Sequence, residues 1–107
     1  MKKVIATVDA PKAVGPYSQA IEVNGTLYIS GQIPVNPADG KIQEEITAAA
    51  HQSLKNIGAI LKEAGMTYDN VVKTTVLLAD IADFKAVNEV YAEYFTGDKP
   101  ARACYQA

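Results

Sequence analysis

The fold is decided by the segment Gln19-Ala20-Ile21-Glu22-Val23-Asn24-Gly25-Thr26-Leu27-Tyr28-Ile29-Ser30. Apolar and more polar residues alternate on both sides of the pair Asn24-Gly25. This pair readily adopts the positive φ angles of a tight turn. The segment therefore predicts a β-hairpin. Outside it, a short strand is predicted near Lys3 to Thr7, and two prolines with an Asp-Gly pair predict a loop or a short hairpin end over residues 34–41.

Two helices are predicted further along the chain. The first begins near Ile46 and ends near Ala64, because apolar residues recur at steps of three and four, and Gly65 supplies the stop. The second follows Asp80, whose carboxylate can accept hydrogen bonds from the first free N–H groups, and Gly97 closes it. Its apolar positions are Phe84, Val87, Tyr91, Tyr94 and Phe95.

The remaining segments predict strands. Residues Val71 to Leu78 are rich in β-branched side chains and predict a largely buried strand, and residues 100–107 read as the entry to a last strand. The order β, β-hairpin, α, β, α, β predicts an α+β sandwich in which two helices cover one face of a sheet. The other face then needs a cover, which another copy of the chain could supply.

The composition narrows the class of protein. The 107 residues are 49% hydrophobic and 21% charged, which is typical of one globular domain. A net charge of -2 and a pI near 5.3 give no strong positive field, so we do not expect a nucleic-acid partner. No apolar run suits a membrane span or a signal peptide, which favours a cytoplasmic protein. A single cysteine and a single histidine, His51, predict neither a disulfide nor a metal site, and His51 is expected on a helix surface.

Arg102 is the most informative candidate for chemistry. It is the only arginine, beside nine lysines, and it lies between the small residues Ala101 and Ala103 on the last predicted strand. A guanidinium can hold a carboxylate with two parallel hydrogen bonds. The alternative is a surface or interface salt bridge with Asp or Glu.

Five other residues are weaker candidates. Cys104 lies two residues after Arg102 and shares its face of a strand, where a cation favours the thiolate, but packing is the simpler role. Tyr17 follows a Gly-Pro turn and could orient a polar ligand or close the turn. Ser30 and Gly31 end a strand and could approach a ligand, although a β-bulge explains the glycine equally well. Asn88 lies at the margin of an apolar stripe, where its amide could reach a ligand, a partner subunit or only water.

The quoted pieces converge on one family. They are Ala10-Pro11 with Gly15-Pro16-Tyr17-Ser18-Gln19, Ser30-Gly31-Gln32-Ile33-Pro34, Lys73-Thr74-Thr75-Val76, Asp83-Phe84 with Val87-Asn88, and Pro100-Ala101-Arg102-Ala103-Cys104. Together they closely resemble the RidA/YjgF family of reactive-intermediate deaminases. The resemblance covers essentially the whole chain, in order and at matching spacings.

The resemblance implies a chorismate-mutase-like α+β fold with an antiparallel-rich mixed sheet and two helices packed on one face. It also implies a homotrimer that forms a central barrel, with ligand sites in clefts between subunits. The implied reaction is hydrolysis of 2-iminobutanoate and 2-iminopropanoate, the enamine/imine products of dehydratases, to 2-keto acids and ammonia. Neither a cofactor nor a metal is implied.

The same resemblance implies a role for each matching position. Arg102, Cys104 and Tyr17 fall on catalytic positions, and Arg102 also binds the substrate carboxylate. The other substrate-binding positions are Ser30, Gly31, Asn88 and Ala103. An alternative is a non-catalytic regulatory protein that binds small metabolites in the same cleft; a translation inhibitor or ribonuclease also has precedent in the family, but the acidic pI and lone histidine disfavour a ribonuclease.

One departure from the family concerns its last strand. Members continue past the Arg-x-Cys segment through a loop and a strand that carries a glutamate, which is thought to position or activate the attacking water. The sequence given stops at Ala107 and holds no residue that matches this glutamate. The expectation is a single domain over residues 1–107 without that loop and strand, in an incomplete chain rather than a naturally short protein.

Overall fold

The computed structural model describes all 107 residues and begins with a three-stranded antiparallel sheet. Its strands are β1 (Lys3–Ile5), β2 (Ala20–Val23) and β3 (Thr26–Ile29), in the order β1-β2-β3. The β2–β3 turn places Asn24 at φ 52° and Gly25 at φ 78°, so both central residues adopt the left-handed conformation that this turn requires. The predicted hairpin and the predicted first strand are confirmed.

The first helix also agrees with its prediction. Helix α1 (Ile46–Glu63) begins where the Glu45 carboxylate accepts a hydrogen bond from the Thr47 N–H, and Ala64 caps its end. Gly65 follows at φ 75°, which is the left-handed residue expected after a last helical turn.

The second helix ends earlier than predicted. Asp80 accepts from the Ala82 N–H at the start of a short 3-10 turn, η2 (Ile81–Asp83), which leads into α2 (Phe84–Tyr94). The prediction that Gly97 closes this helix is wrong, because the backbone already leaves the helical conformation at Phe95. The Phe95 ring turns into the core, and the Lys99 ammonium donates to the Phe95 carbonyl.

The last two strands form a parallel pair. Strand β4 (Lys73–Leu78) follows a 3-10 turn, η1 (Tyr68–Asn70), and pairs in parallel with β5 (Ala101–Gln106). The connection between them runs through α2, so the three elements make a β–α–β unit. The prediction of a largely buried strand over residues 71–78 is wrong, since only Leu78 is buried. The exposure of its residues alternates along β4 because only the helix-facing side of the strand is covered.

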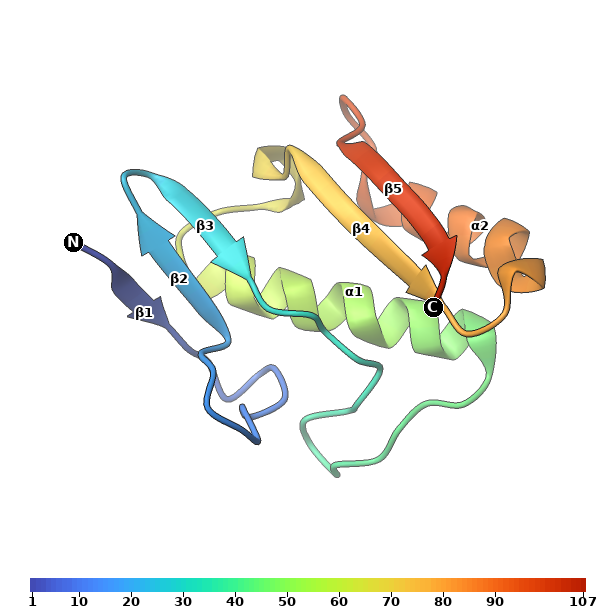
Figure 1. Cartoon of the computed structure of the whole chain (residues 1–107), viewed down its shortest axis with the longest axis horizontal. Coiled ribbons are helices and arrows are strands. Elements are labelled where there is room, and N and C mark those ends of the chain that lie inside the picture. Colours follow the sequence, from blue (N-terminus) through green and yellow to red (C-terminus); the bar gives the residue numbers. More distant parts are fainter.

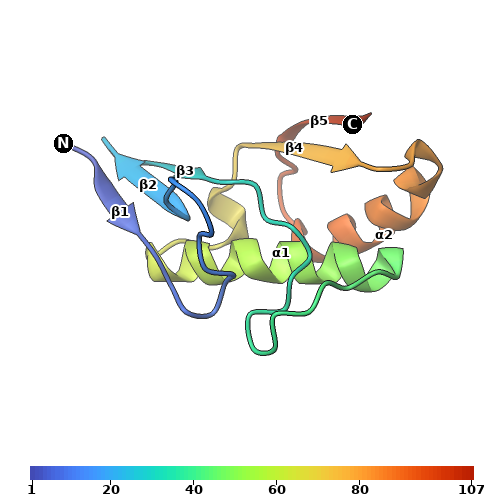
Figure 2. The same cartoon turned by 60° about the horizontal axis from the view of Figure 1, so that its bottom comes forward.

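The elements make two layers. Both helices lie beneath one face of the strands, with α1 running under both sheets (Figures 1 and 2). Two apolar clusters fill the space between the layers. One is centred on Ile5, Ala10, Ala20 and Ile60, and the other on Leu54, Val90, Tyr91 and Phe95. Helix α1 contributes to both clusters and so joins the two sheets.

Two buried polar side chains attach loops to this framework. The Gln19 amide accepts from the Thr7 N–H at 2.7 Å and donates to the carbonyls of Thr7, Ala10 and Pro11. The Asn56 amide donates to the Ile33 and Val35 carbonyls at 3.2 and 3.0 Å. Each amide therefore supplies hydrogen-bond partners to several backbone groups of a loop.

The outer face of the strands is uncovered in a single chain. Val4, Ile21 and Tyr28 are cross-strand neighbours on this face, and Leu77 lies opposite Tyr105 in the parallel pair. The side chains of Val4, Tyr28, Leu77 and Tyr105 are more than half exposed. Only 13 of 107 residues are buried, so the chain alone covers little of its apolar surface.

Candidate functional site

Arg102 on β5 extends its side chain toward α2. Its Nη1 donates a hydrogen bond to the Asn88 Oδ1 at 2.7 Å. The guanidinium carbon lies 4.9 Å from the centre of the Tyr91 ring and 5.6 Å from that of Phe84, both within cation–π range. No Asp or Glu carboxylate of the chain pairs with it, since the one ion pair joins His51 and Glu93. The salt-bridge alternative is therefore not realised within one chain.

Local sequence spacing explains this arrangement. Phe84, Asn88 and Tyr91 are separated by four and three residues, which puts them on one face of α2. The parallel register sets Arg102 beside Thr74, and the Thr74 hydroxyl shares a 2.7 Å hydrogen bond with the Tyr91 hydroxyl. Thr74 is thus a neighbour of both Arg102 on β5 and Tyr91 on α2, and it fixes the two elements relative to each other.

Most N–H donors of the Arg102 guanidinium make no hydrogen bond within the chain. The guanidinium carries five N–H donors, and the chain uses one of them, for Asn88. The remaining donors suit a carboxylate, which a guanidinium binds with two parallel hydrogen bonds. The side-chain carbonyl oxygen of Asn88 is occupied by this hydrogen bond from Arg102.

The neighbours of Arg102 on β5 point in two directions. Cys104 is two residues further along the strand and shares the side of Arg102, where its free thiol is partly buried. Ala103 lies between them, in register with Thr75, and turns its methyl group to the opposite, outer face. A ligand on the Arg102 side could meet only the backbone of Ala103.

The other three predicted residues belong to the antiparallel half of the molecule. Tyr17 is about half exposed in a turn where its N–H donates to the Gly15 carbonyl at 2.8 Å. Ser30 follows β3, and its hydroxyl donates to the Ser18 carbonyl at 2.6 Å. Gly31 is exposed. No hydrogen bond joins these residues to Arg102, Asn88 or Cys104 within the chain, so one copy presents two separate groups.

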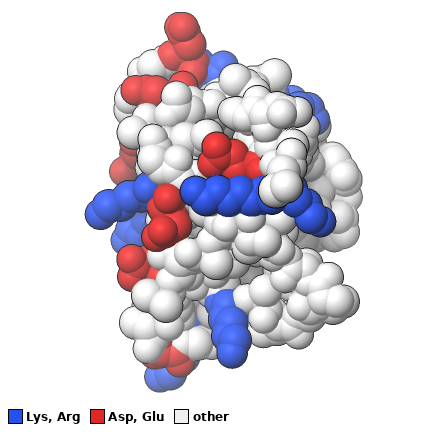
Figure 3. All heavy atoms as spheres, turned by 90° about the vertical axis from the view of Figure 1, so that its left-hand side faces the viewer, with Lys and Arg blue, Asp and Glu red and all other residues white.

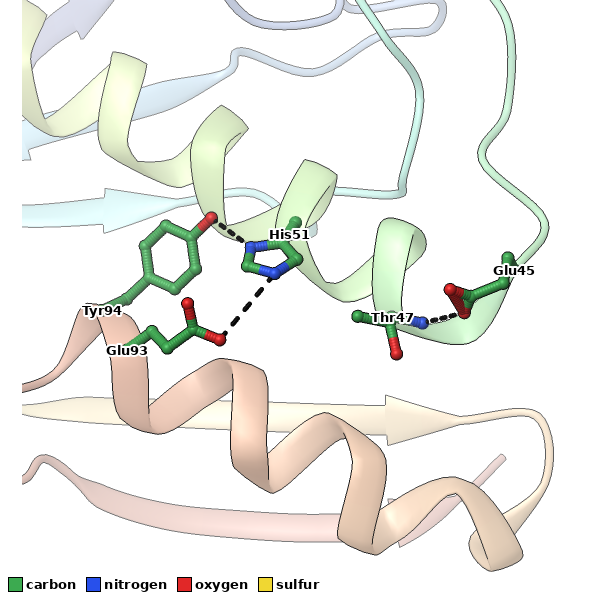
Figure 4. A network of polar contacts seen from close by, with 5 residues as sticks. All are labelled: Glu45, Thr47, His51, Glu93 and Tyr94. Carbon is green, nitrogen blue, oxygen red and sulfur yellow. Dashed lines mark hydrogen bonds and ion pairs between the residues drawn. The ribbon is translucent and has the colours of Figure 1, made fainter.

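His51 was expected on a helix surface, and its side chain on α1 is 31% exposed. Its Nδ1 lies 2.7 Å from the Tyr94 hydroxyl and its Nε2 lies 3.9 Å from the Glu93 carboxylate, so the imidazole bridges α1 and α2 (Figure 4). Burial and the Glu93 charge raise the pKa of Tyr94. Burial, followed by the neighbouring Tyr94, raises the pKa of Tyr68 to about 12. This cluster joins the helices and contains no predicted site residue.

Two surface hollows of one chain are lined by residues other than Arg102. An open depression of about 550 Å³ is lined by Thr7, Asp9, Lys55, Gly58, Ala59, Lys62, Glu63 and Tyr68. A second, of about 390 Å³, is lined by Asn36, Gln43, Ala48, His51, Gln52 and Lys55. Neither hollow contains a predicted site residue.

Charged side chains and potential metal ligands offer no further candidate site. Lysines and carboxylates mix on the face seen in Figure 3, which therefore carries no field of one sign. No three His, Cys, Asp or Glu side chains gather in a geometry that would hold a metal ion. Neither helix is long and apolar enough to cross a bilayer.

Comparison with known sequences gives a consistent result. A family model described as Endoribonuclease L-PSP matches residues 7–107. The mouse protein named 2-iminobutanoate/2-iminopropanoate deaminase is 55% identical over 107 residues, which cover 99% of this chain and 79% of the mouse protein. The Arabidopsis thaliana protein named Reactive Intermediate Deaminase A, chloroplastic, is 51% identical over 106 residues, which cover 98% of this chain and 57% of that protein.

Solved structures agree with the fold. The Rid-family protein YyfA from Yersinia pestis superposes with a TM-score of 0.98 at 50% identity, covering 100% of this chain and 86% of YyfA. The YjgF gene product from E. coli gives a TM-score of 0.95 at 42% identity, covering 98% and 85%. E. coli TdcF, solved with bound serine, gives 0.95 at 39% identity, also covering 98% and 85%. The predicted α+β fold with two helices on one face is confirmed.

Proposed function

Because this chain belongs to the Endoribonuclease L-PSP family, also called the YjgF/RidA family, we propose that it is a 2-imino acid deaminase. Its substrates are 2-iminobutanoate and 2-iminopropanoate, the compounds in the names of the mouse and human relatives that are each 55% identical to it. The observation in the structure that carries the proposal is Arg102, a guanidinium held in place with no carboxylate of the chain on it.

The reaction needs little beyond positioning. Water adds to the carbon of the protonated imine, R–C(=NH2+)–COO−, and the resulting amino alcohol expels nitrogen to give R–C(=O)–COO− and NH4+. The imine carbon is already electrophilic when its nitrogen is protonated, so no covalent nucleophile is required. Fixing the substrate carboxylate on Arg102 places this carbon at a defined point relative to the attacking water.

The two separated groups of site residues support a site between copies of the chain. Arg102, Asn88 and Cys104 occupy the parallel half, and Tyr17, Ser30 and Gly31 the antiparallel half. The exposed apolar side chains on the outer strand face need a cover, which a homotrimer with its sheets packed around a common axis provides. In that assembly, the phenol of Tyr17 and the thiol of Cys104 complete the wall around the bound carboxylate.

The test is an assay in which a threonine dehydratase generates 2-iminobutanoate in the cuvette. A carbonyl reagent such as semicarbazide traps the imine before it hydrolyses in water, and the purified protein competes with the trap. We expect the initial rate of semicarbazone formation to fall as the protein concentration rises, because semicarbazide reacts with the imine faster than with the 2-ketobutanoate that hydrolysis releases. A trapped fraction that does not respond to the protein would refute the deaminase.

A second candidate is binding without catalysis, which the TdcF structure with bound serine favours as an observation on a relative. The same Arg102 would then hold the carboxylate of a small amino or keto acid. Titration with 2-ketobutanoate, followed by NMR, would show saturable binding under either proposal. Binding without any effect on the trapped imine would favour this second candidate.

A further inference from the structure

We propose that Tyr91, tethered by Thr74, is a positioning residue that fixes the orientation of the Arg102 guanidinium. This inference rests on the proposed function, in which Arg102 binds the substrate carboxylate. The juxtaposition that carries it is the Tyr91 ring 4.9 Å from the guanidinium carbon, with its hydroxyl on the Thr74 hydroxyl at 2.7 Å.

Arg102 needs an external support for its orientation. Its side chain is exposed in the chain, so close packing does not hold it. The single hydrogen bond to Asn88 fixes one nitrogen but leaves the guanidinium free to rotate about that contact. Bidentate binding of a carboxylate requires the whole plane to be set, because both N–H donors must point in parallel. An aromatic ring beside the plane supplies the missing constraint.

Tyr91 is a firmer support than Phe84, the other ring near the guanidinium. Tyr91 is 8% exposed, packs on Phe95 with ring centres 4.5 Å apart, and is hydrogen-bonded through its hydroxyl. Phe84 is 40% exposed and lies farther away, at 5.6 Å. The chain therefore holds the Tyr91 ring at both ends and leaves Phe84 at the rim.

The tether also sets where the ring lies relative to the arginine. Thr74 stands beside Arg102 in the parallel register of β4 and β5, so the anchor of the Tyr91 hydroxyl is the neighbour of the residue that the ring supports. Thr74 on β4, Tyr91 on α2 and Arg102 on β5 are therefore each a neighbour of the other two. Removing the Thr74 hydroxyl would loosen the guanidinium while leaving both Arg102 and the Tyr91 ring in the chain.

The first experiment follows the guanidinium directly and does not need catalysis. Because Arg102 is the only arginine, its Nε–H gives one unambiguous NMR signal. We expect the ¹⁵N order parameter of this group to fall in Thr74→Val and Tyr91→Phe, which keep the ring but lose the tether, and to fall further in Tyr91→Leu. The matched control is Tyr94→Phe, which keeps its ring and loses a hydroxyl hydrogen bond to His51 instead of Thr74; it should leave the order parameter unchanged. An unchanged value in all three site variants would overturn the inference.

The second experiment measures turnover of dehydratase-generated 2-iminobutanoate. We expect kcat/KM to fall roughly 3- to 30-fold in Tyr91→Leu. It should fall about 2- to 5-fold in Thr74→Val and in Tyr91→Phe. The losses of these last two variants should not add in the double variant, because both remove the same hydrogen bond. In an Arg102→Ala background, Tyr91→Phe should cause no further loss, since nothing remains to be positioned. A loss of the same size in both backgrounds would show a merely structural role and overturn the inference. If the wild-type protein shows no turnover, the proposed function fails, and the order parameters still decide whether Tyr91 positions Arg102.

Discussion

At the scale of single residues, Asn56 shows how a buried amide holds a loop. It is 1% exposed, and its two donors satisfy the Ile33 and Val35 carbonyls of the loop after β3. Asn56→Leu leaves both carbonyls without their partner, so we expect a loss of about 2–4 kcal/mol in the free energy of unfolding. The matched control is Gln52→Leu on the same helix, which removes only the hydrogen bond donated to Asn56 and should cost less than about 1 kcal/mol. Urea denaturation that gives equal costs for both variants would contradict this role.

Tyr68 gives the protein a dependence on alkaline pH. Burial and the neighbouring Tyr94 raise its pKa from the ordinary 10.0 to about 12. The neutral phenol is therefore favoured in the folded state, whose stability is complete below pH 10 and falls as the pH rises from 10 toward 12. Absorbance of tyrosinate should show one tyrosine that ionises last. We expect Tyr68→Phe to abolish that late phase and to flatten the fall in stability between pH 10 and 12.

At the scale of elements, the packing of Tyr68 on helix α1 depends on the absence of a side chain at Gly58. A Cβ atom at Gly58 would lie 2.7 Å from the Cζ atom of Tyr68, whose hydroxyl is held by the Leu54 carbonyl at 2.6 Å. Gly58→Ala should therefore destabilise the protein by about 1–3 kcal/mol, although alanine is the better helix former. In a Tyr68→Leu background the clash is gone, and the same substitution should stabilise by roughly 0.5–1 kcal/mol. Thermal unfolding that shows the same sign in both backgrounds would contradict this steric explanation.

The elements whose signals are local could be predicted from the sequence. The hairpin depends on Asn24-Gly25, and Gly65 directly follows the capping residue of α1; all three residues adopt the positive φ that their type favours. The end of α2 could not be predicted in this way, because it is set by the burial of Phe95 and a lysine contact from beyond the helix. The exposure of β4 was also missed, since β-branched composition does not show which face of a strand is covered.

The candidate site was predicted in part. The uniqueness of Arg102 and the position of Asn88 on a helix margin pointed to residues that the structure brings together. Phe84 and Tyr91 were identified only as apolar positions of the helix, although their spacing from Asn88 already placed all three on one helical face. The role of Thr74 depends on the parallel register of β4 and β5, for which the sequence carries no local signal. The contact between His51 and Tyr94 was missed for the same reason, because the two residues lie 43 positions apart in the sequence.

At the scale of the whole molecule, the proposed site between copies predicts complementation. Light scattering should give three times the mass of the 11.4 kDa chain. Tyr17→Ala and Arg102→Lys chains should each be weakly active alone, because each damages one side of every site. Refolded together in equal amounts, they should recover about one quarter of the wild-type sites, since a random trimer unites an intact Tyr17 side with an intact Arg102 side at that frequency. Hybrid trimers without any recovery would place both residues in one chain's site.

Arg102→Lys, measured in the assembled protein, tests most directly whether this arginine anchors the substrate carboxylate. Lysine keeps the charge but replaces the planar fork with a flexible point charge. We expect kcat/KM for 2-iminobutanoate to fall roughly 10- to 150-fold, equivalent to about 1.5–3 kcal/mol, with unchanged thermal stability and assembly. Near-normal kcat/KM in a folded lysine variant would remove Arg102 from the active site and contradict the proposed deaminase mechanism.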